Sequence, residues 1–224
     1  MHLVRLADVC RYYQNGETIV WAVDHVDLTV HPAEFVCIVG PSGSGKTTLL
    51  NLIAGIDRPT SGHVYFETHD LCTLSESERT SLRLHQMGFV FQSYNLIPVL
   101  TARENVELIL LLQNVPKPER SRRVAALMER LGLASLMDRY PHQMSGGQQQ
   151  RVAVARAIVH HPKLVLADEP TANLDSTNAR ALIEMMIDLA HREEITFIVA
   201  THDTRLVEQA DRVIHLVDGR IVDA

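Results

Sequence analysis

Residues 40–47 read Gly40-Pro41-Ser42-Gly43-Ser44-Gly45-Lys46-Thr47, and this stretch decides the fold class. Its pattern, Gly-x-x-x-x-Gly-Lys-Thr, is that of a phosphate-binding loop between a strand and a helix. The glycines let successive backbone N–H groups turn inward and form a concave nest for phosphate oxygens. Lys46 adds a positive charge toward the β- and γ-phosphates, and the hydroxyl of Thr47 can bind Mg²⁺. The stretch therefore predicts a nucleotide site.

Short, nearly continuous apolar runs lie before and after this loop. They are Phe35–Val39, Phe89–Phe91, Leu164–Ala167 and Phe197–Ala200. Continuous apolarity is typical of parallel strands buried on both faces, with helices covering the sheet. Each run ends at a polar group, and open α/β sheets bind ligands beyond the carboxyl ends of their strands. The runs lead into the phosphate loop, Gln92, Asp168-Glu169 and Thr201-His202. We therefore expect these groups to share one site.

The remaining segments complete an α/β fold of the P-loop NTPase type in a single domain, residues 1–224. Alternating apolar residues such as those of Val26–Val30 predict an antiparallel β subdomain near the start. Asp218-Gly219 between short apolar runs predicts a hairpin. From about Thr101 to Arg139 the apolar spacing is helical, and its arginines are interpreted as a solvated face. This predicts an inserted helical subdomain over roughly residues 95–160.

Composition narrows the class of protein. The chain has 224 residues and a formal net charge of −6, which argues against a nucleic-acid binder with a broadly basic face. No apolar run approaches the ~20 residues that span a bilayer, and the start resembles no signal peptide. Cys10, Cys37 and Cys72 show no ligand spacing, nor do the histidines, so we expect buried reduced thiols and no transition metal. These features predict a cytosolic protein.

Asp168 and Glu169 follow an apolar strand and are candidates for catalysis. An aspartate at this position can hold Mg²⁺ opposite the loop threonine, usually through water. The next carboxylate, Glu169, is placed to polarise an attacking water as a general base. The alternative is that both residues merely cap the turn before Pro170.

A second helix N-terminus follows at Ser145-Gly146-Gly147-Gln148, with a serine cap and two glycines. It is a second candidate anion site in one chain. A single domain has no obvious use for two such sites, unless the second serves a nucleotide held by another copy.

These motifs together resemble the ATP-binding cassette family over essentially the whole chain. Residues 144–148 resemble the family signature LSGGQ, with Met144 in place of leucine. Leu164–Glu169 is similar to the Walker B strand, and Ala172–Asp175 resembles the D-loop. Gln92 resembles the Q-loop glutamine and His202 the switch histidine. Tyr13 falls where the family stacks an aromatic ring on adenine, and its neighbour Tyr12 leaves that assignment open.

The resemblance implies that two copies meet head to tail and sandwich two molecules of ATP with Mg²⁺. Each ATP then lies between the phosphate loop of one copy and Ser145 and Gly147 of the other. The implied catalytic residues are Glu169, His202 and Gln92, and the implied Mg²⁺ ligands are Thr47, Gln92 and Asp168. The implied nucleotide-binding residues are Tyr13, Gly40, Pro41, Ser42, Gly43, Ser44, Gly45, Lys46, Thr47, Thr48, Ser145, Gly146, Gly147, Gln148 and Asp175.

Within the family, residues 89–98 and 167–175 look closest to the lipoprotein-releasing and macrolide-export ATPases, although Ala172 stands where glycine is usual. The resemblance implies an ATPase subunit that powers a separate membrane permease from the cytoplasmic face of the membrane. The alternative is a regulatory cassette of the cell-division type, which gates a membrane partner and transports nothing. The transported substrate cannot be inferred from these residues.

An apolar segment directly after Gln92 is a candidate docking surface for the permease. Its residues are Tyr94, Leu96, Ile97, Pro98, Val99 and Leu100. A groove lined by them would receive a short cytoplasmic helix of the permease by apolar burial. The alternative is that they simply pack the joint between the sheet and the helical subdomain.

Overall fold

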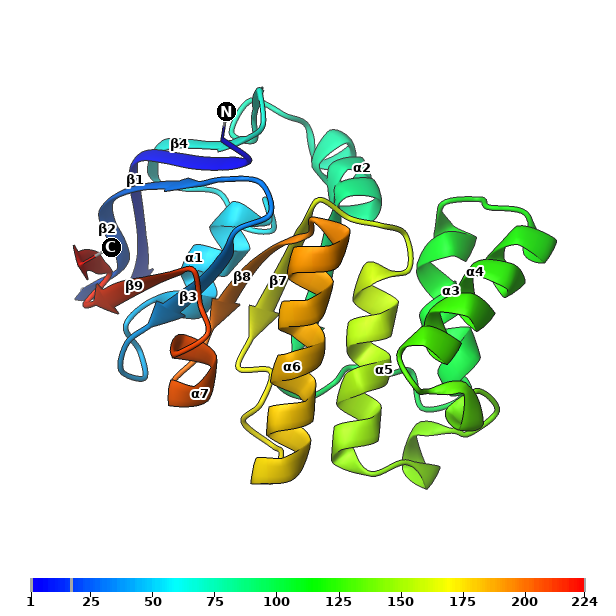
Figure 1. Cartoon of the computed structure of the whole chain (residues 1–224). Helices are drawn as coiled ribbons and strands as arrows, with labels where there is room; N and C mark the ends of the chain where they lie inside the picture. Colours follow the sequence, from blue (N-terminus) through cyan, green and yellow to red (C-terminus); the bar gives the residue numbers. More distant parts are fainter. Residues whose placement is uncertain (1, 17, 224) are drawn as a thin grey trace. The chain divides into compact units, whose positions relative to one another are not determined.

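The computed structural model describes residues 2–16 and 18–223. The chain forms two compact units, Met1–Arg83 with Thr196–Ala224 and Leu84–Ile195 (Figure 1).

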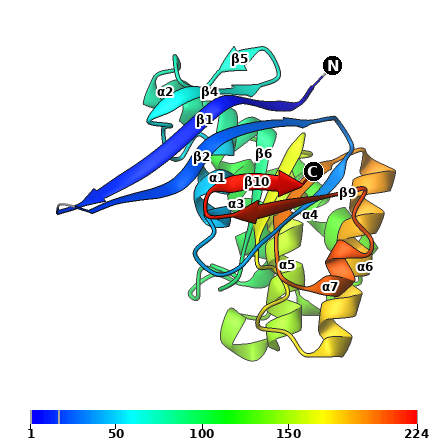
Figure 2. The ribbon, with the colours of Figure 1, turned by 90° about the vertical axis from the view of Figure 1, so that its left-hand side faces the viewer.

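An antiparallel sheet occupies the first half of the first unit, with strand order β2-β1-β4-β5. The strands are β1 (Val4–Asn15), β2 (Thr18–Val30), β4 (Ser61–Phe66) and β5 (His69–Asp70). Val26, Leu28 and Val30 are buried, as their alternation predicts. β4 pairs with β1 only as far as Cys10. The far end of the β1–β2 hairpin therefore extends beyond β4 (Figure 2).

A second sheet in this unit contains β10, β9, β3 and β8 in that order. Its strands are β3 (Phe35–Val39), β8 (Thr196–Ala200), β9 (Arg212–Val217) and β10 (Arg220–Asp223). β3 runs parallel to β8 and β9, and β10 returns antiparallel through the predicted hairpin at Asp218-Gly219. Phe35–Ile38 are all fully buried, which explains their continuous apolarity. Helix α1 (Lys46–Ile53) follows β3, and α7 (Thr204–Val207) follows β8.

The second unit pairs β6 (Met87–Phe91) in parallel with β7 (Leu164–Asp168). Its helices are α3 (Ala102–Leu112), α4 (Lys117–Arg130), α5 (Gly146–Ile158) and α6 (Ser176–Glu193), with short 3₁₀ turns at Ala134–Leu136 and Pro141–Gln143. Helix α2 (Glu76–Gln86) precedes β6. α5 packs against β6, α3 and α6, and α6 lies beside it in Figure 1. Because α5 is covered on several sides, its residues from Val152 to Ala155 are all fully buried.

Candidate nucleotide site

The phosphate loop connects β3 to α1 through a backbone conformation that requires glycine. Gly45 is the N-cap of α1 with φ 103°, and a Cβ there would lie 1.9 Å from the carbonyl oxygen of Ala22. The loop is also tied to the β9–β10 hairpin, because the N–H of Gly219 donates to the carbonyl oxygen of Ser44 at 3.0 Å. These constraints hold the loop in one shape before any phosphate binds.

The ammonium group of Lys46 lies over this loop. Its Nζ donates to the carbonyl oxygens of Gly40 at 2.8 Å and Pro41 at 3.1 Å. The positive charge and the N-terminus of α1 therefore act on the same small volume, the arrangement that binds phosphate oxygens.

The predicted switch histidine emerges at the same edge of the first unit. Ile38 and Ala200 are neighbours in the parallel β3–β8 ladder, and the N–H of Thr201 donates to the carbonyl oxygen of Ile38 at 3.0 Å. His202 is the next residue and is exposed. Because parallel strands end at a common edge, the first unit brings His202 to the side where the phosphate loop begins.

The two candidate adenine-stacking tyrosines lie on the extended part of β1. Successive strand residues point to opposite faces, so Tyr12 and Tyr13 do not share one. The ring of Tyr12 contacts Trp21, with centroids 5.2 Å apart. The hydroxyl of Tyr13 donates to Asp57 at 2.7 Å, and the guanidinium of Arg11 lies 4.5 Å from its ring centroid. Each ring therefore has its own partner, and adenine stacking by either stays a prediction.

In the second unit, the Q-loop glutamine and the candidate general base leave neighbouring strand ends. Phe91 and Asp168 are paired in the parallel β6–β7 ladder, so Gln92 and Glu169 are the next residues on adjacent strands. The side-chain amide of Asn173 donates to the carbonyl oxygen of Gln92 at 3.0 Å. This bond links the D-loop to the Q-loop within one unit.

The signature segment forms the N-terminus of α5, as its serine and glycines predict. The hydroxyl of Ser145 accepts from the N–H of Gln148 at 3.3 Å, and the side chain of Gln148 accepts from the N–H of Ser145 at 2.9 Å. This reciprocal pair is a capping box. A Cβ on Gly147 would lie 2.4 Å from the side-chain oxygen of Asn178, so only glycine lets α5 approach α6 this closely.

Asp175, the predicted D-loop aspartate, caps α6. Its carboxylate accepts from the N–H groups of Thr177 at 3.0 Å and Asn178 at 2.9 Å. The bond from the backbone of Asn178 is the largest cause that lowers the pKa of Asp175. The side-chain amide of Asn178 also donates to Asp175 at 2.6 Å and lies against Gly147, so one side chain joins the D-loop to the signature.

Two polar residues of α5 that the sequence patterns did not single out, one fully buried and one half-buried, hold these loops. Gln150, fully buried in α5, donates to the carbonyl oxygens of Pro170 at 2.7 Å and Phe91 at 3.3 Å. Arg156, also in α5, donates to the carbonyl oxygens of Tyr94, at 2.9 Å, and Asn95. The available signal was a polar residue at a buried helical position, which requires partners.

The loop that follows Gln92 is held by Asn105, which is fully buried in α3. Its side chain accepts from the N–H of Ile97 at 2.7 Å and donates to the carbonyl oxygens of Ile97 and Leu100, each at 3.1 Å. The apolar side chains of this loop are left half-buried or exposed, and Val99 is 76% exposed. The backbone of the candidate docking segment is thus fixed while its side chains remain accessible.

The predicted site residues divide between the two units. Tyr13, residues 40–48 and His202 belong to the first unit, and Gln92, Ser145–Gln148, Asp168, Glu169 and Asp175 belong to the second. Their assembly into one nucleotide site stays a prediction. The predicted Mg²⁺ ligands offer a hydroxyl, an amide and a carboxylate from Thr47, Gln92 and Asp168. All three are oxygen donors, which suit Mg²⁺.

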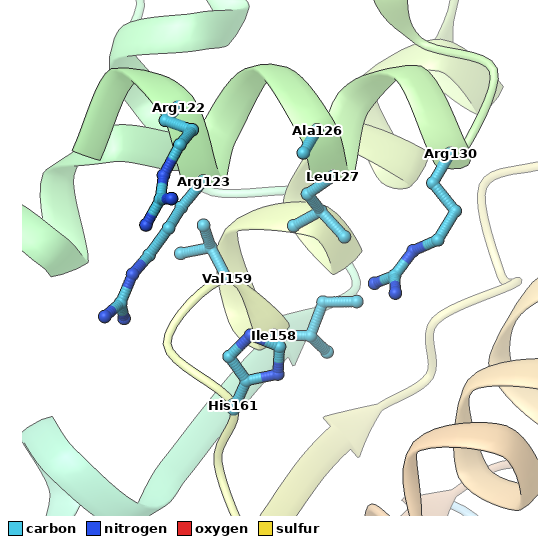
Figure 3. A pocket seen from close by; sticks show the side chains of 8 residues that line it. All are labelled: Arg122, Arg123, Ala126, Leu127, Arg130, Ile158, Val159 and His161. Atoms are coloured by element: carbon cyan, nitrogen blue, oxygen red, sulfur yellow. The ribbon is translucent and has the colours of Figure 1, made fainter. Parts of the chain in front are cut away.

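A cavity of about 400 Å³ lies within the second unit, between α4 and the end of α5 (Figure 3). Its apolar lining includes Leu127, Ile158 and Val159, and it also has cationic side chains, among them Arg122 and Arg130. None of its eight lining residues is a predicted site residue. The arginines that the sequence analysis interpreted as a solvated face of α4 thus include part of this lining.

Comparisons with known proteins agree with the fold and with the family that the sequence resembles. The family model described as ABC transporter matches residues 23–172. The lipoprotein-releasing system ATP-binding protein LolD of Pseudomonas fluorescens is 45% identical, covering 96% of this chain and 95% of that protein. The macrolide export ATP-binding/permease protein MacB of Brucella melitensis is 44% identical, covering 98% of this chain and 34% of that protein.

A solved structure is also similar over nearly the full length. The ATP-binding cassette MJ0796, a dimer in a post-hydrolysis state bound to ADP and Pi, has a TM-score of 0.90 at 41% identity. The match covers 98% of this chain and 97% of that one. The predicted fold class is therefore confirmed. Among residues 2–16 and 18–223, no helix has the length and apolarity needed to cross a bilayer.

Proposed function

Because the chain belongs to the ABC transporter family, in which it is an ATPase, we propose that two copies close head to tail around two ATP molecules and drive a separate membrane permease. The phosphate loop of one copy and the signature of the other would enclose each nucleotide. The permease would be of the lipoprotein-release or macrolide-export type, and would hold this ATPase at the cytoplasmic face of the membrane. Nucleic acid is not an expected partner.

The observation that carries the dimer proposal is the N-terminus of α5. Ser145 and Gln148 cap one another there, and the two glycines between them carry no side chains that would obstruct an anion. The same chain already has a phosphate loop at the N-terminus of α1. A second helix N-terminus is therefore available for a nucleotide held by another copy, and the similar cassette MJ0796 is described as a dimer.

The residues have distinct roles in this proposal. The phosphate loop and Lys46 bind and orient the phosphates, and Glu169 accepts a proton from the attacking water. Thr47, Gln92 and Asp168 would hold Mg²⁺, which neutralises charge on the phosphates when bound. His202 and Gln92 contact the γ-phosphate end of the nucleotide. Asp175 couples the two sites through its position beside the signature.

The partner is inferred from the relatives and from the segment after Gln92. LolD is named for a lipoprotein-releasing system, and MacB for a macrolide export protein with a permease part. In this chain, the backbone of residues 97–100 is anchored to Asn105 while Val99 stays 76% exposed. An apolar helix of a permease would bury this surface.

The experiment is co-expression of the chain with a candidate permease that has few spanning helices and a large extracytoplasmic domain. We expect a complex in detergent, and ATP turnover in reconstituted vesicles that changes when permease substrate is added. The Glu169→Gln variant should form the complex without turnover. If the purified chain hydrolyses ATP but binds no such permease, the ATPase assignment stands and the proposed partner is wrong.

A further inference from the structure

A cluster of His63, Asp70 and Cys72 lies on the β4–β5 hairpin, outside every residue assigned to the nucleotide. One ligand atom from each residue lies within 4.8 Å of the others. From this cluster we propose that the hairpin binds a thiophilic divalent cation, Zn²⁺ in the first instance, through the thiolate of Cys72, the imidazole of His63 and the carboxylate of Asp70.

The register of the hairpin places these side chains on one face. Tyr65 pairs with Asp70, and the N–H of Leu71 donates to the carbonyl oxygen of Val64 at 2.8 Å. This register sets Asp70 diagonal to His63 across the strands, and Cys72 follows in the turn after β5, in which the N–H of Thr73 donates to the carbonyl oxygen of Asp70 at 3.1 Å. Val64 and Leu71 point to the opposite face and are buried. The strand pairing and the turn after it therefore bring the three potential ligands together, although His63 and Cys72 are nine positions apart in the sequence.

Two of the potential ligands are already in contact, whereas the thiol of Cys72 donates to the carbonyl oxygen of Gly62 at 3.8 Å. Nδ1 of His63 lies 2.8 Å from Oδ2 of Asp70, and the other carboxylate oxygen accepts from the N–H of Cys72 at 2.9 Å. Ligand atoms around a tetrahedral Zn²⁺ are about 3.3–3.6 Å apart, given Zn–S of about 2.3 Å and Zn–N of about 2.0 Å. The carboxylate and imidazole would separate slightly and the thiol would move inward, which are side-chain adjustments within a fixed backbone.

The mixed donor set selects the cation. Sulfur with nitrogen and one oxygen suits Zn²⁺ or a similar thiophilic ion, whereas Mg²⁺ and Ca²⁺ prefer oxygen ligands throughout. Binding displaces the proton of the Cys72 thiol to solvent, because the thiolate is the ligand. The side chain of His63 is 56% exposed. A cation can therefore enter from solvent, and water can complete its coordination.

A second group of three potential ligands serves as an internal comparison. Cys10, Asp24 and His25 also lie within 4.8 Å of one another. There the carboxylate of Asp24 is paired with Arg220 at 2.7 Å, and Cys10 is 2% exposed. The arginine neutralises the carboxylate and the thiol is buried, so we expect this group not to bind the cation.

The test is a Co²⁺ titration of the full chain without an affinity tag. The buffer contains a non-thiol reductant and no nucleotide. Co²⁺ substitutes for Zn²⁺, and its thiolate-to-metal charge-transfer band reports a Co–S bond. We expect this band to saturate at one Co²⁺ per chain and to disappear when Zn²⁺ is added. Zn²⁺ should also raise the unfolding temperature of the wild type.

Variants identify the thiol. We expect the band and the Zn²⁺-dependent rise in unfolding temperature to be lost in Cys72→Ser and His63→Gln and kept in Cys10→Ser. Circular dichroism of each variant checks that it folds. The proposal is overturned if the wild type gives no band, or if a folded Cys72→Ser variant keeps it.

Discussion

The buried side-chain amide of Gln150 donates a hydrogen bond to the carbonyl oxygen of Pro170, 2.7 Å away, and a longer one to that of Phe91. Pro170 follows the candidate general base, and Phe91 precedes the Q-loop glutamine. Gln150 itself lies two residues beyond the signature in α5. One amide thus connects the signature helix to the loop of the candidate general base and to the loop of Gln92.

Replacing this amide tests whether the connection matters for hydrolysis. Gln150→Leu removes both hydrogen bonds and leaves two carbonyl oxygens with fewer donors, at a cost of about 1–3 kcal/mol in the free energy of unfolding. We expect ATP turnover to fall about tenfold, because Glu169 and Gln92 lose a shared support, while nucleotide affinity changes about twofold or less. Gln149→Leu is the control, since the side-chain amide of Gln149 donates to the carbonyl oxygen of the nearby Met144 at 3.1 Å and not to the loop of Gln92 or of Glu169. Equal turnover in the two variants would contradict the connection.

The role of Glu169 is tested by removing its charge and keeping its shape. Glu169→Gln should lower turnover roughly 10²-fold or more, because the amide cannot accept a proton from water. ATP binding should persist, and the stalled protein should accumulate as a dimer measurable by light scattering. Near-normal turnover of the purified variant would exclude Glu169 as the general base.

A site shared between copies predicts different defects for Lys46 and Ser145. Lys46→Ala should abolish nucleotide binding by the isolated chain, since Lys46 acts within its own phosphate loop. Ser145→Arg should leave that binding nearly intact and block dimer formation and hydrolysis. Ser145 also caps α5, and losing a cap costs about 1 kcal/mol. Ser145→Ala is therefore the matched control, because it removes the cap without adding bulk.

If Ser145→Arg weakened ATP binding by the monomer as much as Lys46→Ala does, the hypothesis that two copies share each site would be wrong. Isothermal calorimetry at a concentration where the wild type is monomeric measures this.

Burial of His160 predicts a pH-dependent loss of stability. Burial lowers its pKa from 6.5 to about 4, and its Nε2 lies 3.1 Å from the carbonyl oxygen of Met87. The folded state favours the neutral form of His160. The contribution of this residue to the free energy of unfolding is therefore fully present above pH 6.5 and is lost as the pH falls toward 4. In His160→Gln, which keeps a donor but does not titrate, the urea midpoint should fall less between about pH 7.5 and about pH 5. In His161→Gln, which changes the exposed neighbour, the urea midpoint should fall with pH as it does in the wild type. If His161→Gln reduced this fall and His160→Gln did not, the assignment to His160 would be refuted.

The parts of this fold that could be predicted were those encoded in contiguous patterns. β3 was predicted with its observed ends, because all of its first four residues are buried and therefore apolar. β4 and β5 were not predicted, because His63, Tyr65 and Asp70 face outward and interrupt the apolar pattern. Asp218-Gly219 was identified because each residue adopts the positive φ that such a hairpin needs.

The same distinction applies to the candidate site. The phosphate loop and the signature were found because each motif is a short contiguous run whose glycines and polar residues determine the local backbone conformation. Gln150 was not found, because its partners lie 20 and 59 residues away and are backbone carbonyls, which carry no side-chain signal. Cys72 and His63 likewise showed no ligand spacing, because the β4–β5 pairing and the turn after it bring them together.

The docking segment is tested by placing charge on it. Leu96 and Leu100 are half-buried in a loop whose backbone Asn105 holds, so Leu96→Glu and Leu100→Glu should leave the chain folded and able to bind ATP. We expect each change to reduce co-purification with the permease about tenfold or more, because a carboxylate buried against an apolar helix is costly to desolvate. Leu112→Glu is the matched control, since Leu112 is 54% exposed at the end of α3. Circular dichroism and ATP affinity verify the fold of each variant. If both loop variants are folded and retain the permease as well as Leu112→Glu does, the side chains of this segment pack within the chain and the permease binds elsewhere.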